Sequence, residues 1–335
     1  MTLSAEDAMG NKQRIGWIDI AKGFATLCVI VGHTISVASP LRRIIFSFHM
    51  PLFFILAGFT FHPKPRKKLF VTSAKRLLIP YFIVVSLWFG QKLLQTAPAD
   101  FPNVLSDYLW AMVFASGTTV RPFGFSAIGA IWFLMVLFTA RIICNELFSF
   151  FDSRDTPLLW QGIICGAIGY IGVFIGSNRG LYLPFSFDIT LFAVSLMWCG
   201  YACQNVAIDR FIAEKRVVLV SLVIWLLCCR FSSLELAARR YEGGIVAVIA
   251  AVFGTFVVCQ IAYAVERARN KPILILNKYL TFCGVNGMTM YCFHSMDWWI
   301  PWSSLKLIQG FPFQRGFASL FRIFYISLLT KLSKL

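Results

Sequence analysis

Three polar residues whose types and spacing could do chemistry, Asp19, Lys22 and His33, lie in one apolar stretch of the chain. Successive residues of an α-helix turn by about 100°, so a helix here would point all three within about 60° of one another. Lys22 and His33 would be about 16 Å apart along the axis, roughly half the hydrocarbon thickness of a bilayer. Ionisable groups inside a membrane span are costly and indicate a polar interior. We therefore predict that this stripe leads from one membrane face to a histidine deep in the bilayer.

The chemistry that suits this stripe is proton transfer from a hydroxyl. A neutral imidazole titrates near about pH 6.5 and can act as a general base, which makes His33 the first candidate. His49 and His294 are expected at the same depth, where His49 could orient His33, contact an acceptor or cap a helix start. No H-E-x-x-H pattern or closely spaced carboxylate accompanies the histidines, so no metal site is predicted.

The elements that must position these residues are membrane-spanning helices. The chain is 58% hydrophobic and 14% charged, whereas a soluble domain carries about 25% charged residues. Apolar runs of about 20 residues predict an all-α polytopic membrane protein with about ten spans. We expect no cleaved signal peptide, and the patch at 108–115 is too short to span. The expected spans are 17–37, 44–61, 77–95, 128–150, 158–176, 187–204, 217–230, 244–265, 281–300 and 315–332.

The distribution of basic residues predicts the orientation of the spans. The net charge is +16, which in a membrane protein is typical of the positive-inside rule and does not require nucleic acid as a partner. With ten spans, three basic loops fall on the side of both termini, which we expect to be cytoplasmic. The chain is then one domain, 1–335, in the inner or plasma membrane, with a cytoplasmic segment at 1–16 and an extracytoplasmic loop at 96–127.

The motifs around these residues resemble the acyltransferase 3 family of integral-membrane acyltransferases, and most closely its fucose 4-O-acetylase-like subgroup. The opening of the first span, followed by the Val-Gly-His that contains His33, is similar to the first helix of the family, and the segment around His49 is similar to its second helix. Further weak matches follow in the expected order. The matching segments are 17–23 (WIDIAKG), 31–33 (VGH), 48–58 (FHMPLFFILAG), 75–81 (KRLLIPY), 131–134 (IWFL) and 284–288 (GVNGM).

The resemblance implies a ten-span fold with both termini inside, and transfer of an acetyl group from cytoplasmic acetyl-CoA to a hydroxyl of an extracytoplasmic or lipid-linked glycan. The catalytic histidine of the family corresponds to His33. Many members carry Arg eleven residues before that histidine, where this chain has Lys22. Lysine cannot form the two-pronged contact of arginine with a phosphate, so the role of this position differs here.

The leading hypothesis is therefore a membrane O-acetyltransferase with His33 as general base, and an acetyl-His33 intermediate stays open. We expect Asp19 to pair with Lys22, and Trp132 and His294 to contact the acceptor, although Trp132 could equally be a structural aromatic of the membrane interface. The phosphates of acetyl-CoA are expected to bind four basic residues: Arg14, Lys22, Lys75 and Arg76.

Two other functions fit the composition. A transporter or flippase of a glycan or lipid-linked substrate is compatible with ten spans and buried polar groups, although no pair of interrupted helices in corresponding halves points to one. A non-catalytic membrane scaffold or sensor is the third. The expected partners are the lipid bilayer and a glycan acceptor, with monomer and homodimer both open.

Overall fold

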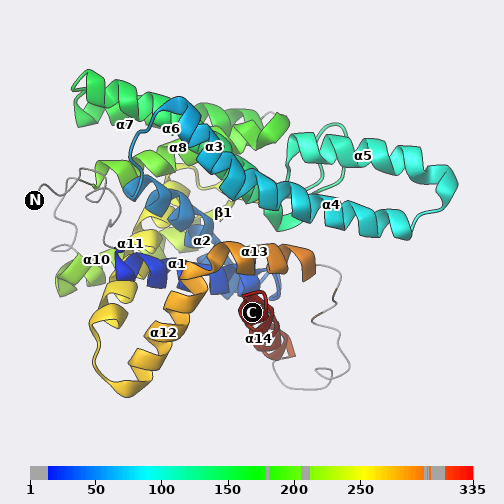
Figure 1. The fold of residues 1–335 in the computed structure, drawn as a ribbon. Helices are drawn as coiled ribbons and strands as arrows, with labels where there is room; N and C mark the ends of the chain where they lie inside the picture. The colour runs from blue at the N-terminus through cyan, green and yellow to red at the C-terminus, as the bar shows by residue number, and fades with distance from the viewer. Residues whose placement is uncertain are drawn as a thin grey trace, which may run out of the picture.

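The fold is almost entirely helical, as a computed structural model of residues 14–178, 181–204, 212–297, 300, 302 and 314–334 shows (Figure 1). A short antiparallel hairpin, β1 (Ser233–Glu235) and β2 (Arg240–Glu242), is the sheet of the described chain. The helices are α1 (Gly16–Gly32), α2 (Pro40–Phe59), α3 (Arg66–Ser73), α4 (Ile79–Leu94), α5 (Phe101–Phe114), α6 (Trp132–Ser153), α7 (Leu158–Val173), α8 (Phe187–Ala202), α10 (Lys215–Phe231), α11 (Ile245–Arg267), α12 (Lys271–Val285), α13 (Gly287–Met296) and α14 (Gln314–Leu332).

Six helices of the described chain are long and apolar enough to cross a membrane. This confirms a polytopic helical membrane protein, while the count of ten spans and the cytoplasmic position of the termini remain predictions. One of the six runs without interruption from α3 through a π-helical turn into α4. The six are Pro40–Phe59, Arg66–Leu94, Gly129–Ser153, Leu158–Ser177, Pro184–Ala202 and Ile245–Arg267.

Two expected segments differ from the structure. The run 281–300, expected as one span, contains the end of α12 and then α13, with a break at Asn286. Asn and Gly are poor helix formers, and the Asn286 side chain donates a hydrogen bond to the carbonyl of Phe282 (2.8 Å), which competes with the helical backbone pattern. The expected loop 96–127 contains α5, which lies beside α4 in an arm that projects from the rest of the molecule (Figure 1).

Helix α1, which carries the polar stripe, lies in the middle of the bundle beside α2, α11 and α12 (Figure 1). Its backbone touches that of α12. A Cβ at Gly23 would overlap the carbonyl oxygen of Leu280, and a Cβ at Gly284 would overlap that of Asp19. Small residues of this kind let membrane helices approach closely. The two glycines therefore fix α1 against the C-terminal part of the chain.

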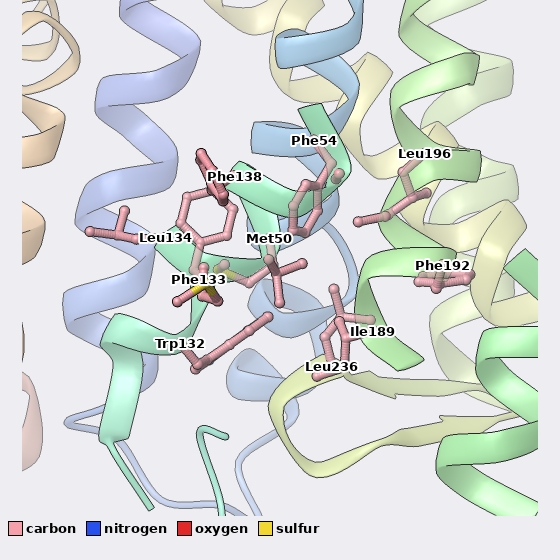
Figure 2. Packing of buried hydrophobic residues seen from close by; sticks show 14 of the residues in the cluster. Met50, Phe54, Trp132, Phe133, Leu134, Phe138, Ile189, Phe192, Leu196 and Leu236 are labelled. Carbon is pink, nitrogen blue, oxygen red and sulfur yellow. The ribbon is translucent and has the colours of Figure 1, made fainter. Parts of the chain in front are cut away.

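The largest apolar cluster holds α2, α6 and α8 together (Figure 2). Met50 and Phe54 from α2 point toward Phe133 and Phe138 of α6, and the ring centroids of Phe54 and Phe133 are 5.1 Å apart. Close packing of rings and branched side chains makes such a core rigid. One face of α2 is thereby fixed, which orients its histidine.

A buried ion pair connects the start of α8 with the β1–β2 connection and with the segment before α6. The guanidinium of Arg239 donates to the carboxylate of Asp188 (2.9 Å) and to the hydroxyls of Ser116 and Ser186, and it lies over the ring of Tyr182. Both charged side chains are at most 1% exposed. A buried pair satisfied in this way holds the loops before α6 and α8 and the β1–β2 hairpin in one arrangement.

Candidate functional site

Three histidines from three helices meet at the end of α1. His33 directly follows α1, and its ring centroid is 5.2 Å from that of His294 on α13. The ring of Phe46 lies between His33 (5.9 Å) and His49 (4.6 Å) on α2. His49 and His294 are 2% and 3% exposed, whereas His33 is exposed. The structure therefore brings the expected histidines together, with His33 as the exposed residue of the three.

The two buried histidines are held differently. Nδ1 of His49 lies 2.8 Å from the carbonyl oxygen of Ile45, which can only accept, so this nitrogen carries the proton and Nε2 is the unprotonated nitrogen of the neutral ring. His49 lies well inside α2, so it does not cap the start of that helix. Nδ1 of His294 has no hydrogen-bond partner, and Oδ1 of Asp297 lies 4.0 Å from it.

Two arginines hold the residues on either side of His33. Nε of Arg42 donates to the carbonyl oxygen of Gly32 (3.2 Å), and Nη1 of Arg322 donates to the hydroxyl of Thr34 (3.1 Å). Gly32 is the last residue of α1, where backbone carbonyls lack helical partners and attract cations. The two contacts fix the backbone that carries His33 from opposite sides, so we name Arg42 and Arg322 the arginine clamp.

Each arginine of the clamp is paired with a carboxylate. Arg42 contacts Glu235 of β1 (2.8 Å), and Arg322 of α14 forms a two-pronged contact with Asp297, including Nε to Oδ2 at 2.7 Å. The side chains of the second pair are 5% and 3% exposed, and losing one partner of such a pair leaves an uncompensated buried charge. The clamp is therefore rigid, and it joins α14 and the hairpin to the end of α1.

These four residues were not among those expected from the sequence. The rule that marked Lys22 also applies to Arg322, a charge inside the expected span 315–332, and to Asp297, three residues after His294. It would have found this pair. Arg42 and Glu235 lie near helix ends and in a hairpin, where charges are ordinary, so their pairing has no signal in the sequence.

A cavity of about 380 Å³ lies between α1, α2, α6, α13 and the helix Arg66–Leu94, and we name it the cationic cavity. Its lining contains five cationic side chains and one carboxylate, Asp19, so the wall carries an excess of positive charge that favours an anionic ligand. The five cations are Arg14, Lys22, Lys64, Arg76 and Arg141.

The expected pairing of Asp19 with Lys22 is wrong. Asp19 instead pairs with Arg14, whose Nε lies 2.6 Å from Oδ2 of Asp19. Arg14 precedes α1, and its long side chain can reach the first turn of the helix, where Asp19 lies. Lys22, one turn further into the cavity, is left to face a ligand. Asp19 is also about 21 Å along α1 from His33, so it lies at the cavity mouth and away from the histidines.

The inner end of the cationic cavity is apolar and ends beside the histidines. Its lining there includes Val29 of α1, Met50 of α2 and Tyr291 of α13. The carbonyl of Val29 accepts the hydrogen bond from the backbone N–H of His33 (3.1 Å), and Met50 directly follows His49. The cavity thus connects a cationic part with an apolar part, where Val29 lies one helical turn from His33.

Of the remaining predicted residues, one lines the cationic cavity and two do not. Arg76 lines the cationic cavity, whereas the neighbouring Lys75 is exposed and does not. Trp132 is 4% exposed and packs against Phe133 in the core (Figure 2), and it is not among the residues that line the cationic cavity. Arg141 of α6 lines the cavity and was not identified, although a cation inside the expected span 128–150 is the same signal that marked Lys22. Among the described residues, no group of three or more His, Cys, Asp or Glu is placed to hold a metal ion.

The chain matches the family model described as an acyltransferase domain, acyltransferase 3, over residues 15–331. The match covers nearly the whole chain, so the protein belongs to this acyltransferase family. Comparisons with curated proteins and with solved structures gave no match.

Proposed function

We propose that this membrane acyltransferase is an O-acetyltransferase of the fucose 4-O-acetylase-like subgroup. It would move an acetyl group from cytoplasmic acetyl-CoA to a hydroxyl of an extracytoplasmic or lipid-linked glycan, in the cell membrane. The observation that carries the proposal is the cationic cavity, which has basic residues at its mouth and an apolar inner end one turn from His33.

The donor fits this cavity by charge and by shape. The phosphates of acetyl-CoA would lie against Arg14, Lys22, Arg76 and Arg141, with Lys75 contributing at the surface by its charge alone. Charge-assisted contacts to phosphate are the strong ones, which accounts for a wall with five cations and one carboxylate. The thin, flexible pantetheine arm would follow the apolar end and place the thioester beside Val29.

The transfer itself needs one base and a fixed geometry. The unprotonated ring nitrogen of His33 takes the proton of the acceptor hydroxyl while that oxygen attacks the acetyl carbonyl carbon. The C–S bond then breaks, and the CoA thiolate leaves and takes up the proton from His33. His294, whose ring centroid is 5.2 Å away, orients the ring of His33, and His49 acts on it through the ring of Phe46. The arginine clamp holds the residues on either side of His33.

The test measures the O-acetyl content of surface glycan by mass spectrometry, in cells that carry wild type, His33→Ala or the control His62→Ala at matched membrane levels. His62 is exposed and lies beyond α2, outside the histidine cluster. We expect acetylation with wild type and His62→Ala and its loss with His33→Ala. Equal acetylation with His33→Ala would remove His33 as the base. A wild type that adds no acetyl group to any glycan, and releases no CoA from acetyl-CoA after purification, would favour the transporter hypothesis.

A covalent variant of the mechanism is tested separately. Purified protein is mixed with acetyl-CoA labelled in the acetyl group, without acceptor, and then denatured. Label retained by wild type and lost in His33→Ala would indicate an acetyl-His33 intermediate, and absence of label together with active transfer would indicate direct attack.

A further inference from the structure

A second cavity, of about 310 Å³, lies between α4, α13 and the segment that leads into α6. It differs from the cationic cavity in its lining, which combines an indole and four aliphatic side chains with three hydroxyls, two glycines and one lysine. Its volume is at the lower end of the range of about 300–1,000 Å³ typical of small-molecule sites. The lining residues used below are Trp88, Lys92, Thr119, Ser126, Gly129 and Ser295.

The two cavities lie toward opposite ends of the same helix. Arg76 lines the cationic cavity and Lys92 the second one, both on the continuous helix Arg66–Leu94. Sixteen residues of helix correspond to about 24 Å, most of the thickness of a bilayer core. A ligand of the second cavity would therefore enter from the membrane face opposite to the cationic mouth.

A single turn of α13 separates the cavities. Tyr291 lines the cationic cavity and Ser295 lines the second one, and the Ser295 hydroxyl donates to the carbonyl of Tyr291 (2.9 Å). The hydroxyl of Tyr291 donates to the carbonyl of Ala130, next to Gly129 in the wall of the second cavity. His294 lies in this same turn and faces His33. The two cavities are thus lined by residues one turn apart on α13, and His294 of the histidine cluster lies in that turn.

The charge in the second cavity is already compensated. Nζ of Lys92 lies 2.9 Å from the carboxylate of Asp107 on α5, and Ser126 donates to that carboxylate from its hydroxyl (2.6 Å) and its backbone N–H (2.8 Å). Lys92 is the one charged residue among the described lining residues. A ligand here meets an aromatic ring, aliphatic side chains and hydroxyls, and no unpaired cation among the described lining residues.

We propose that this second cavity binds the acceptor, and that the acceptor group it takes is a neutral, hydroxyl-rich sugar ring such as a pyranoside. Trp88 offers a flat apolar surface to one face of the ring, and Thr119 and Ser295 offer hydroxyls to its edge. That the bound sugar is the acceptor rests on the proposed function. Binding of a neutral sugar in this cavity does not depend on that function and is measured without catalysis.

The experiment uses full-length protein in lipid nanodiscs and the rate at which a maleimide labels single introduced cysteines. Thr119→Cys reports on the second cavity, and Thr72→Cys reports on the cationic cavity, since both threonines are exposed and line those cavities. Ser86→Cys is the matched control, because Ser86 is an exposed residue of α4 outside both linings. Wild type gives the background of the ten native cysteines, none of which is exposed.

We expect methyl α-D-glucopyranoside and methyl α-L-fucopyranoside to slow labelling of Thr119→Cys at least fivefold and to leave Thr72→Cys and Ser86→Cys unchanged. Coenzyme A should do the reverse, slowing Thr72→Cys alone. The glucuronide, which replaces a hydroxymethyl group by a carboxylate, should protect Thr119→Cys less than the glucoside.

The outcomes separate the two proposals. Glycosides that support transfer yet leave labelling of Thr119→Cys unchanged would overturn the second cavity as the acceptor site while the transferase function stands. Protection of Thr119→Cys by the glycosides without any acetyl transfer would support the sugar-binding site and overturn the proposed transferase function. Equal or better protection by the glucuronide would overturn the preference for a neutral ring.

A kinetic variant tests the same site in a second way. Trp88→Ala should raise the KM for the glycoside about tenfold and leave the affinity for coenzyme A unchanged, because it removes the aromatic surface of the second cavity and Trp88 does not line the cationic cavity. Trp88→Phe, which keeps an aromatic face, should restore most of the loss. An unchanged KM in well-folded Trp88→Ala would contradict the proposal.

Discussion

The cationic cavity and the second cavity lie against the same two elements, the helix Arg66–Leu94 and α13, yet they differ in charge. The first collects five cations around one carboxylate, and the second has one cation that Asp107 compensates. Between them lies the turn that carries His294. Under the proposed function, an anionic donor occupies the first cavity and a neutral acceptor the second, with the transfer at the turn between them.

Loss of His33 should have the largest effect, because both cavities would serve its ring. We expect His33→Ala to lower kcat for transfer by about 10²–10⁴-fold, the usual contribution of a general base. The affinities for coenzyme A and for the glycoside should stay within twofold. The measurement is steady-state transfer together with equilibrium binding of each ligand. A matched loss of both affinities would mean that the variant disturbs the cavities and not the chemistry.

Removal of single cations should affect one cavity and spare the other. Lys22→Ala or Arg141→Ala should weaken binding of coenzyme A about tenfold, a change of about 1.4 kcal/mol, and leave protection of Thr119→Cys by glycosides unchanged. Lys75→Ala should change the coenzyme A affinity less than Arg76→Ala, because Lys75 does not line the cavity. Calorimetric titration checks both statements. A larger effect of Lys75 than of Arg76 would contradict the cationic cavity as the donor site.

The arginine clamp should influence the rate more than either affinity. Arg322→Lys keeps the charge near Asp297 but loses the planar fork, so it should release Thr34 and lower kcat about tenfold with a small change in both KM values. Arg230→Lys, at an exposed position in the last turn of α10, is the control and should leave kcat unchanged. A rise in both KM values without loss of kcat would indicate a merely structural role for Arg322.

The smallest effect is expected from Asp107, at the rim of the second cavity. Partial burial would raise the pKa of this carboxyl, but hydrogen bonds from Ser126 and Lys92 outweigh it, and the pKa lies below its ordinary value. The ion pair therefore stabilises the fold fully above about pH 4, the usual pKa of an unfolded carboxyl, and the contribution is lost as the pH falls through the lower folded value. Asp107→Asn should lower thermal stability slightly at pH 7 and not at about pH 2. An equal loss at both pH values would contradict this assignment.

Much of the fold could be predicted because hydropathy depends on local composition. Apolar runs of span length identified the membrane helices, and the one-turn spacing of Asp19 and Lys22 placed both on one face of α1. The break at Asn286 was missed, because a single Asn between glycines is a weak local signal within an apolar run. Within 96–127, the apolar patch 108–115 was expected to be too short to span and to be an interfacial or re-entrant helix at most, and the structure has the 14-residue helix α5 there.

The site was predicted in part. The sequence by itself determined that Asp19 and Lys22 share one face of an apolar helix that ends just before His33, since helical periodicity alone decides which residues share a face. Only the tertiary structure decided which partners meet. The pairing of Asp19 with Arg14, the joining of Arg42 to Glu235 across 193 positions, and the separation of two cavities by Tyr291 all depend on contacts between distant segments. Such contacts follow from how whole helices pack, and no local pattern of residue types encodes them.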